Sequence, residues 1–234
     1  MSSKKHGDWP NMKLKKQCGN RQDGFSLVEL LMAVVIILIL TGAAVPSILS
    51  AIRQARLRGA SSDYAGLLEE ARIFAIRDNR YYSVRIIAGS GTAQVSQAYV
   101  DMLPKSLTGA SGNGGTSVAA GDPEVTVSTD VVVQAASSAP GTSGLQSLLL
   151  PATTPVTPTD STVTAPTFGP RGLPCTPVTF SGSPGGTICD SSGGPTAFWT
   201  FFENTKSSTW QAVTITPAGR IQKWFYSGST WSKL

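Results

Sequence analysis

The sequence predicts an α+β protein in which a long N-terminal helix carries an antiparallel β-sheet domain. Three observations lead to this prediction. An apolar run extends from Phe25 to about Ile52, and a helical spacing of apolar residues continues it to about Asn79. After that point, short segments rich in β-forming residues alternate with Gly- and Pro-rich turns. The length of 234 residues fits one domain with a long appendage.

A basic, polar segment, residues 1–24, precedes the apolar run. It holds six of the 19 Lys and Arg residues and two of the 14 Asp and Glu residues. The formal net charge of +5 therefore belongs mostly to this segment, and the remaining chain is nearly neutral with 13 basic and 12 acidic residues. Bulk charge thus gives no argument for a nucleic-acid partner. A basic flank before an apolar span predicts that this end stays in the cytoplasm and the C-terminal part lies in the periplasm.

Residues 25–52 are long enough to span a membrane, because about 20 apolar residues cross a hydrocarbon core. Glu29 stands near the apolar start, where an ionised side chain costs several kcal/mol, so this carboxylate needs a role. A cleaved secretory signal with Gly42-Ala43-Ala44 as its cleavage site is one alternative interpretation. The signal anchor of a periplasmic enzyme is another. The long basic segment and Glu29 argue against the secretory signal.

The helix is predicted to continue past the membrane as an amphipathic element to about Asp78-Asn79. Gly42 and Pro46 are the positions at which it is expected to bend or locally melt. Charged residues occupy one side of this second half. The apolar stripe, expected to face the sheet, comprises Ile52, Ala55, Tyr64, Leu67, Leu68, Ala71, Phe74 and Ala75.

The remaining chain is predicted to form strands separated by long loops. A Gly-, Ser-, Thr- and Pro-rich insertion at about 104–166 favours exposed loops, broken by two strand-forming segments. Within it, Leu148-Leu149-Leu150 are expected to dock on the core. The predicted strands cover residues 81–87, 93–100, 124–128, 130–134, 178–180, 197–202, 212–216 and 220–226.

Two cysteines, Cys175 and Cys189, remain beyond the basic segment. In a chain that crosses a membrane, this pair in a Gly- and Pro-rich region predicts a disulfide in an oxidising compartment. Two free thiols are the alternative, and a metal site is disfavoured because no histidine follows Gly24. The carboxylates are scattered, and no zinc-protease, nucleophile-elbow or phosphate-loop pattern is present. We therefore expect no enzyme activity, no cofactor and no metal.

The start of the apolar run, Gly24-Phe25 with Glu29 four residues on, resembles the type IV prepilin signal. The resemblance implies that prepilin peptidase cuts after Gly24 and that Phe25 becomes the N-terminus, which in this family is usually methylated. It also implies that Glu29 neutralises the N-terminus of a neighbouring subunit during assembly. The spacing equally permits Glu29 to pair with the amine of its own Phe25.

The long helix followed by a sheet resembles the pilin fold. In that fold, residues 25–52 would be the membrane and assembly half of the helix, with Glu29 and Pro46 as its assembly residues. Residues 53–234 would be a periplasmic or extracellular globular domain. The implied partners are other pilin subunits, prepilin peptidase and, before assembly, the inner membrane.

Two C-terminal motifs narrow the resemblance to one group of pilin-like proteins. The first motif is Phe168-Gly169-Pro170-Arg171-Gly172. It is followed by a strand, then by the second motif, Pro217-Ala218-Gly219-Arg220, and then by another strand. This order is similar to that of the GspH/FimT group of minor pilins and pseudopilins. The resemblance implies a structural subunit of a type IV pilus or of a type II secretion filament, and it leaves both machines open.

The last strand segment, residues 220–226, suggests an alternative function in DNA uptake. Arg220 and Lys223 alternate with aromatic residues, a pattern that can bind phosphates and stack on bases. Members that take up DNA have a similar G-R-x-R pattern, but Gln222 stands where the second arginine would be. In a strand, Arg220 and Lys223 face opposite sides. The simpler interpretation is an edge strand guarded by a lysine.

Overall fold

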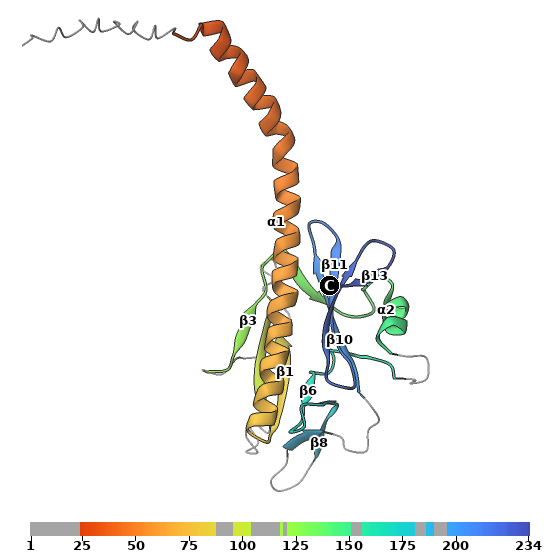
Figure 1. The fold of residues 1–234 in the computed structure, drawn as a ribbon. Helices are drawn as coiled ribbons and strands as arrows, with labels where there is room; N and C mark the ends of the chain where they lie inside the picture. The colour runs from red at the N-terminus through yellow and green to blue at the C-terminus, as the bar shows by residue number, and fades with distance from the viewer. Residues whose placement is uncertain are drawn as a thin grey trace, which may run out of the picture. The chain divides into compact units, whose positions relative to one another are not determined.

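The computed structural model describes residues 24–87, 96–103, 118, 121–150, 156–180, 186–189 and 196–234 (Figure 1). The chain divides into two compact units, Met1–Val45 and Pro46–Leu234. One helix, α1 (Leu27–Arg77), passes from the first unit into the second. All strands and the short helix α2 (Thr142–Leu149) belong to the second unit. The predicted α+β class, with a long helix packed on antiparallel sheets, is confirmed.

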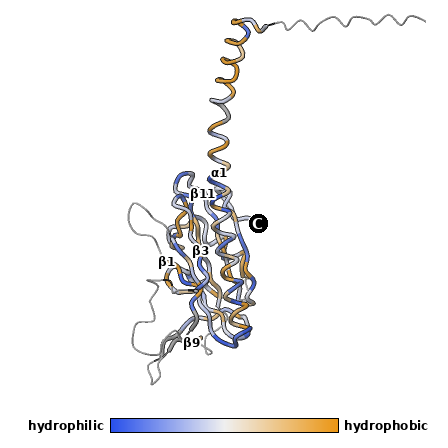
Figure 2. Tube along the Cα trace, turned by 90° about the vertical axis from the view of Figure 1, so that its left-hand side faces the viewer, coloured by the Kyte–Doolittle hydropathy of each residue, from blue (hydrophilic) through white to orange (hydrophobic). Residues whose placement is uncertain are grey.

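The first part of α1 has no packing partner among the described residues of its unit. From Leu27 to Leu40 its large apolar side chains are 43–80% exposed, and Figure 2 shows this stretch as hydrophobic. By length and composition, α1 can cross a membrane. The helix is continuous through Gly42 and Pro46, so the local melting expected there is not observed.

The second part of α1 packs on the sheets through one side. Its buried residues follow the helical period, because residues three and four apart lie on the same side. The stripe prediction is correct for Tyr64 through Ala75, apart from the half-buried Phe74. It is wrong for Ile52, which is 43% exposed, and for the exposed Ala55. The buried set is Leu57, Ala60, Ser61, Tyr64, Leu67, Leu68, Ala71 and Ala75.

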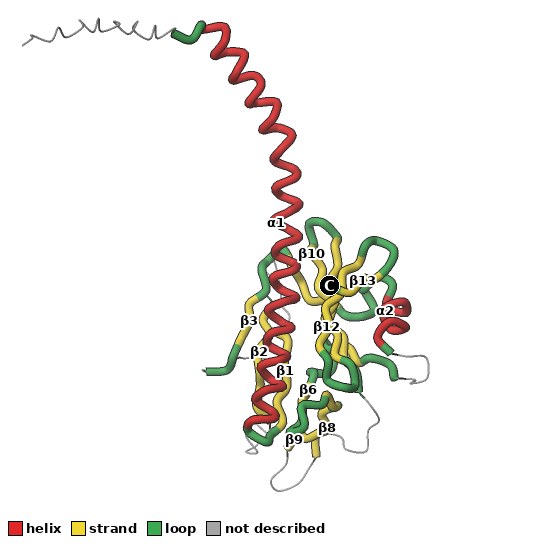
Figure 3. The backbone as a smooth tube through the Cα atoms, in the orientation of Figure 1, coloured by secondary structure: helices red, strands yellow, loops and turns green. Residues whose placement is uncertain are grey.

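Two larger sheets and a hairpin follow (Figure 3). The first sheet has the order β3-β2-β1-β6-β7. The second has the order β13-β12-β11-β10-β4, and β5 joins β10 in parallel. The first sheet comprises β1 (Tyr81–Ile87), β2 (Gln97–Leu103), β3 (Glu124–Thr126), β6 (Thr167–Phe168) and β7 (Pro174–Cys175). The second comprises β4 (Val131–Gln134), β5 (Thr159–Asp160), β10 (Phe198–Asn204), β11 (Thr209–Ile215), β12 (Ile221–Tyr226) and β13 (Trp231–Lys233). The hairpin pairs β8 (Pro177–Phe180) with β9 (Gly186–Cys189).

Strand β10 is buried on both faces and separates two cores. Its alternate residues Phe198 and Phe202 pack with α1 and the first sheet, while Trp199 and Phe201 point to the opposite face. The second core is covered by α2, whose Leu145 and Leu149 are buried. A strand buried on both sides is an almost unbroken apolar run, as in Phe198–Phe202.

The insertion is more structured than its composition predicted. Residues 104–117, 119–120 and 151–155 lie outside the described residues. The described residues of the insertion form β3, β4, α2 and β5. Loops were expected outside the two predicted strands, and this expectation was wrong at Thr142–Leu149, which is helical. Of the three leucines expected to dock, Leu149 and Leu150 are 8% exposed and Leu148 is 56% exposed.

Polar contacts fix the position of α1 along the second sheet. Thr200 Oγ1 donates to Tyr64 Oη at 3.2 Å, and burial raises the pKa of Tyr64 to about 12, so its phenol stays neutral. The amide Nδ2 of Asn204 donates to the carbonyl of Arg53 at 3.3 Å. Arg56 pairs with Asp130, and Ser61 donates to Gln211. Because buried polar groups must be paired, these contacts select one register of the helix on the sheet.

Candidate processing and assembly site

The bond between Gly24 and Phe25 lies in an open stretch just before α1. A Cβ added to Gly24 would meet no atom within 4 Å, and the Phe25 side chain is 81% exposed. The backbone here is not yet helical, because α1 begins at Leu27. An enzyme that needs an extended, unobstructed peptide can therefore reach this bond.

Glu29 occupies the first turn of α1. The helix starts with a hydrogen bond from the amide of Leu30 to the carbonyl of Ser26 at 3.1 Å, which places the carboxylate beside free helix N–H groups. A negative charge at this end of a helix is favourable. After Gly24 the first basic side chain is Arg53, so the apolar stretch itself supplies no cation for Glu29. Cleavage after Gly24 would create one, the amine of Phe25, four residues before Glu29 in the sequence.

The comparison with known families decides what this arrangement is. Residues 19–45 match the model of the prokaryotic N-terminal methylation motif. The chain is a type IV pilin-like protein. The match contains Gly24, Phe25 and Glu29, and it ends at Val45, the last residue of the first unit of this pilin-like protein. No significant match is found among curated proteins or among solved structures.

Pro46 follows directly after the matched motif. Its ring nitrogen has no hydrogen to donate to the carbonyl of Gly42, which would be the acceptor in a regular helix. Thr41 Oγ1 donates to the carbonyl of Ile37 at 2.7 Å. At Pro46 the helix of the pilin-like protein therefore lacks one backbone donor.

The two C-terminal motifs meet at α1. Gly172, in the turn between β6 and β7, has φ +69°, and Gly219, in the turn between β11 and β12, has φ +76°. Arg72 donates from Nε to the carbonyl oxygen of Gly172 at 3.0 Å. A Cβ on Gly219 would come within 2.8 Å of the same oxygen. Both turns therefore need glycine, for backbone conformation and for close approach.

Arg220 and Lys223 do not form a pair. Lys223 lies on the α1 side of β12 and donates from Nζ to Ser62 Oγ at 3.0 Å, whereas Arg220 is exposed in the preceding turn. The expectation of an edge strand was wrong, because β12 lies between β11 and β13.

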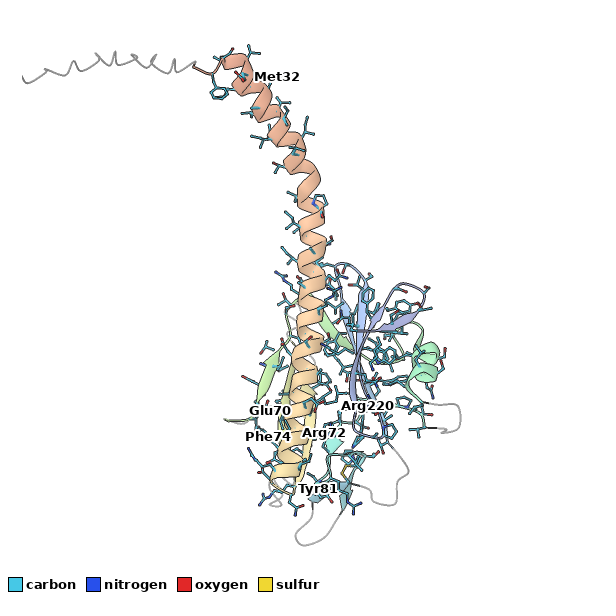
Figure 4. The ribbon with its side chains drawn as sticks, viewed as in Figure 1. Met32, Glu70, Arg72, Phe74, Tyr81 and Arg220 are labelled. Atoms are coloured by element: carbon cyan, nitrogen blue, oxygen red, sulfur yellow. A yellow bond between two sulfur atoms is a disulfide. The ribbon has the colours of Figure 1, made fainter. Side chains whose placement is uncertain are left out.

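The turn that precedes Arg220 lies close to Arg72. A Cβ added to Gly219 would lie 3.7 Å from Cζ of Arg72, and Arg171 directly precedes Gly172, whose carbonyl accepts from Arg72 (Figure 4 shows Arg72 and Arg220). Arg171 is exposed, and the side chain of Arg72 is 32% exposed and lies 3.6 Å from Glu69. Sequence reasoning missed Arg72 and Arg171 as neighbours, although Arg171 stands inside the quoted motif.

Cys175 at the end of β7 and Cys189 at the end of β9 are joined by a disulfide, with their Cα atoms 5.4 Å apart. The bond connects the first sheet to the β8–β9 hairpin. Within the described part of the chain, no group of three or more His, Cys, Asp or Glu residues is placed to hold a metal ion.

Proposed function

We propose that the protein is a minor pilin or pseudopilin of the GspH/FimT type, a structural subunit of a type IV pilus or type II secretion filament. The observation that carries the proposal is the methylation motif on an exposed apolar helix, which continues as the central helix of a folded unit. The meeting of the Gly172 and Gly219 turns supports the GspH/FimT assignment, because both motif glycines have positive φ and contact each other.

In this proposal, the chain has three regions that end in different places. Residues 1–24 are a cytoplasmic leader that prepilin peptidase removes. Residues 25–52 hold the subunit in the inner membrane and later pack in the filament. Residues 53–234 form the periplasmic domain, which reaches the filament surface. The exposure of Leu27–Leu40 supports this order, because apolar side chains without a partner among the described residues need lipid or other subunits around them.

Glu29 is proposed to act with the amine of Phe25 in a neighbouring subunit. Bringing two opposite charges together in lipid offsets the cost of burying each one alone. Before assembly, the same carboxylate is close enough in sequence to pair with the amine of its own chain. Pro46 is proposed to allow adjustment of the helix where the membrane half meets the folded unit.

Mass spectrometry of the purified protein tests the processing step. We expect an N-terminal peptide that begins at methylated Phe25, and a Gly24→Val variant that keeps its leader because the added side chain blocks the peptidase. Filaments sheared from cells should contain the processed chain. An intact N-terminus at Met1, or one at Val45, would contradict the proposal and favour an anchor or a secretory signal.

DNA binding is a second candidate, favoured by three arginines on or next to the residues of the Gly172–Gly219 contact. Arg72 contacts the Gly172 carbonyl, and Arg171 and Arg220, both exposed, are the sequence neighbours of Gly172 and Gly219. Arginine groups of this kind bind phosphates through charge-assisted hydrogen bonds. We propose this cluster, and not Arg220 with Lys223, as the contact for DNA if the subunit serves in uptake.

A gel shift at low salt tests this candidate, because phosphate contacts are strongest there. We expect Arg171→Ala and Arg220→Ala each to weaken binding several-fold. The matched control is Lys223→Ala, which should leave affinity unchanged because Lys223 contacts Ser62. If the full-length protein in detergent produces no shift, DNA binding is excluded. An equal loss for all three variants would contradict the arginine cluster.

A further inference from the structure

Three arginines stand where the apolar run of α1 ends. Ile48 and Ile52 are 57% and 43% exposed, and Arg53, Arg56 and Arg58 follow directly after them in the folded unit. Positive charge beside a membrane span favours the cytoplasmic side. In the proposed topology these arginines lie on the opposite side, so their charge works against the orientation of the chain. They therefore need a role of their own.

Only part of this positive charge is used by the fold. Arg56 pairs with Asp130. Among the described residues, no carboxylate forms a salt bridge with Arg53 or with the exposed Arg58. The next acidic side chain along α1 is Asp63, more than one helical turn later. Two positive charges at the end of the apolar run are thus left uncompensated within the described part of the unit.

The turn between β10 and β11 brings a third positive charge to this end of the unit. Asn204 is fully buried and donates from Nδ2 to the carbonyl of Arg53 at 3.3 Å. Its Oδ1 accepts from the amides of Lys206 and Ser207 at 3.1 and 3.2 Å. One buried amide therefore binds the helix through its nitrogen and shapes the turn through its oxygen. Lys206 is exposed in this turn, which is attached to the helix at Arg53.

We call Arg53, Arg58 and Lys206 the basic collar, and its dimensions suit the polar layer of a bilayer. Arg53 and Arg58 point about 140° apart around α1, and they are about 7.5 Å apart along its axis. The polar layer on each side of a hydrocarbon core is roughly 5–8 Å thick. The basic collar therefore fits within this layer when Ile48 and Ile52 lie at the edge of the hydrocarbon.

We propose that the basic collar binds the phosphate groups of anionic phospholipids and holds the folded unit against the membrane surface before assembly. The inference rests on the proposed function, which places the subunit in the inner membrane, and it names lipid as a partner of the folded unit. Arginine and lysine bind phosphate through charge-assisted hydrogen bonds, and basic residues next to a span attract anionic lipids. Entry into a filament breaks these contacts, so the basic collar retains subunits that have not yet assembled.

The first test measures how closely the folded unit approaches bilayers of defined composition. The full chain with Cys18→Ser carries a fluorophore on Thr129→Cys, its free thiol beside the Cys175–Cys189 disulfide. Thr129 is exposed and adjoins Asp130, which pairs with an arginine of α1. The protein is placed in nanodiscs with a quencher on their headgroups. We expect stronger quenching with phosphatidylglycerol present than with phosphatidylcholine alone, and the difference should vanish at about 1 M salt, which screens exposed charges.

The second test removes charge from the basic collar. Arg58→Gln combined with Lys206→Gln should lower the equilibrium constant for the bilayer-bound position about 30-fold, because each basic side chain at an anionic surface contributes about fivefold. Both side chains are exposed, so folding should be unchanged. The matched control, Lys223→Gln combined with Lys233→Gln, removes the same charge elsewhere on the second sheet and should leave quenching unchanged. An equal loss in both double variants would overturn the inference.

Inorganic phosphate distinguishes a lipid surface from a site for free phosphate. At equal ionic strength, phosphate and chloride should weaken the quenching equally. A stronger effect of phosphate, or equal quenching in the two kinds of nanodisc, would overturn the inference while the filament function stands. Absence of the processed chain from filaments, with the expected quenching intact, would refute the filament function and leave the lipid contact standing.

Discussion

Replacing Gly219 by alanine should lower the free energy of unfolding by about 2–4 kcal/mol, a large part of a typical domain's stability. Two costs combine. Alanine disfavours the backbone conformation at φ +76°, and its Cβ would lie 2.8 Å from the carbonyl oxygen of Gly172. That oxygen is held by the side chain of Arg72, so it cannot move away freely.

Urea unfolding of the full chain in detergent, followed by tryptophan fluorescence, measures this effect because Trp199, Trp224 and Trp231 are buried. The control is Gly228→Ala. Gly228 has φ +97° but nothing within 4 Å of an added Cβ, so only the backbone cost of about 1–2 kcal/mol applies. Equal losses for both variants would mean that the contact with Gly172 contributes nothing.

Replacing Glu29 by alanine should leave cleavage after Gly24 largely intact and reduce incorporation into filaments about 70- to 400-fold, the factor that corresponds to the cost of the uncompensated charge. The reason is that the amine of Phe25 would enter the apolar interior without a counter-charge, which costs about 2.5–3.5 kcal/mol per charge. The next acidic residue after Glu29 is Asp63, more than thirty positions later, so no carboxylate of the same segment replaces it.

Immunoblots of the sheared filaments and of the membrane fraction give the incorporation ratio. Glu124→Ala, which removes an exposed carboxylate of the folded unit, serves as the control and should assemble normally. Normal incorporation of Glu29→Ala would refute the assembly role. If Glu29→Ala is instead retained uncut, the carboxylate acts in processing, which the proposal does not assign to it.

The sequence predicted α1 and most of the strands because their signals are local. Tyr81–Ile87 was placed with both ends correct, since β-forming residues fill it and a turn precedes it. The local melting expected at Pro46 was absent, because a proline inside a long helix removes one hydrogen bond but leaves the neighbouring turns intact. Residues 93–95, the predicted start of one strand, lie outside the described residues.

The parts that depend on distant contacts could not be predicted. Helix α2 is short and has no side-chain cap, and it is stabilised by the docking of Leu145 and Leu149 on the second core. The arginine cluster depends on a contact between Arg72 and Gly172, which are 100 residues apart. The outward position of Ile52 depends on where the sheets end along α1, which no local pattern encodes.

The contacts between α1 and the second sheet also set the order of biogenesis. Tyr64 and Thr200 are 136 residues apart, and Ser61 and Gln211 are 150 apart. The apolar side of a helix synthesised early therefore stays uncovered until nearly the whole chain has been made. Such late closure slows folding and exposes the nascent chain to aggregation. In the proposed topology, anchorage by the first part of α1 would keep each chain tethered and separate during this interval, before the subunit joins any other.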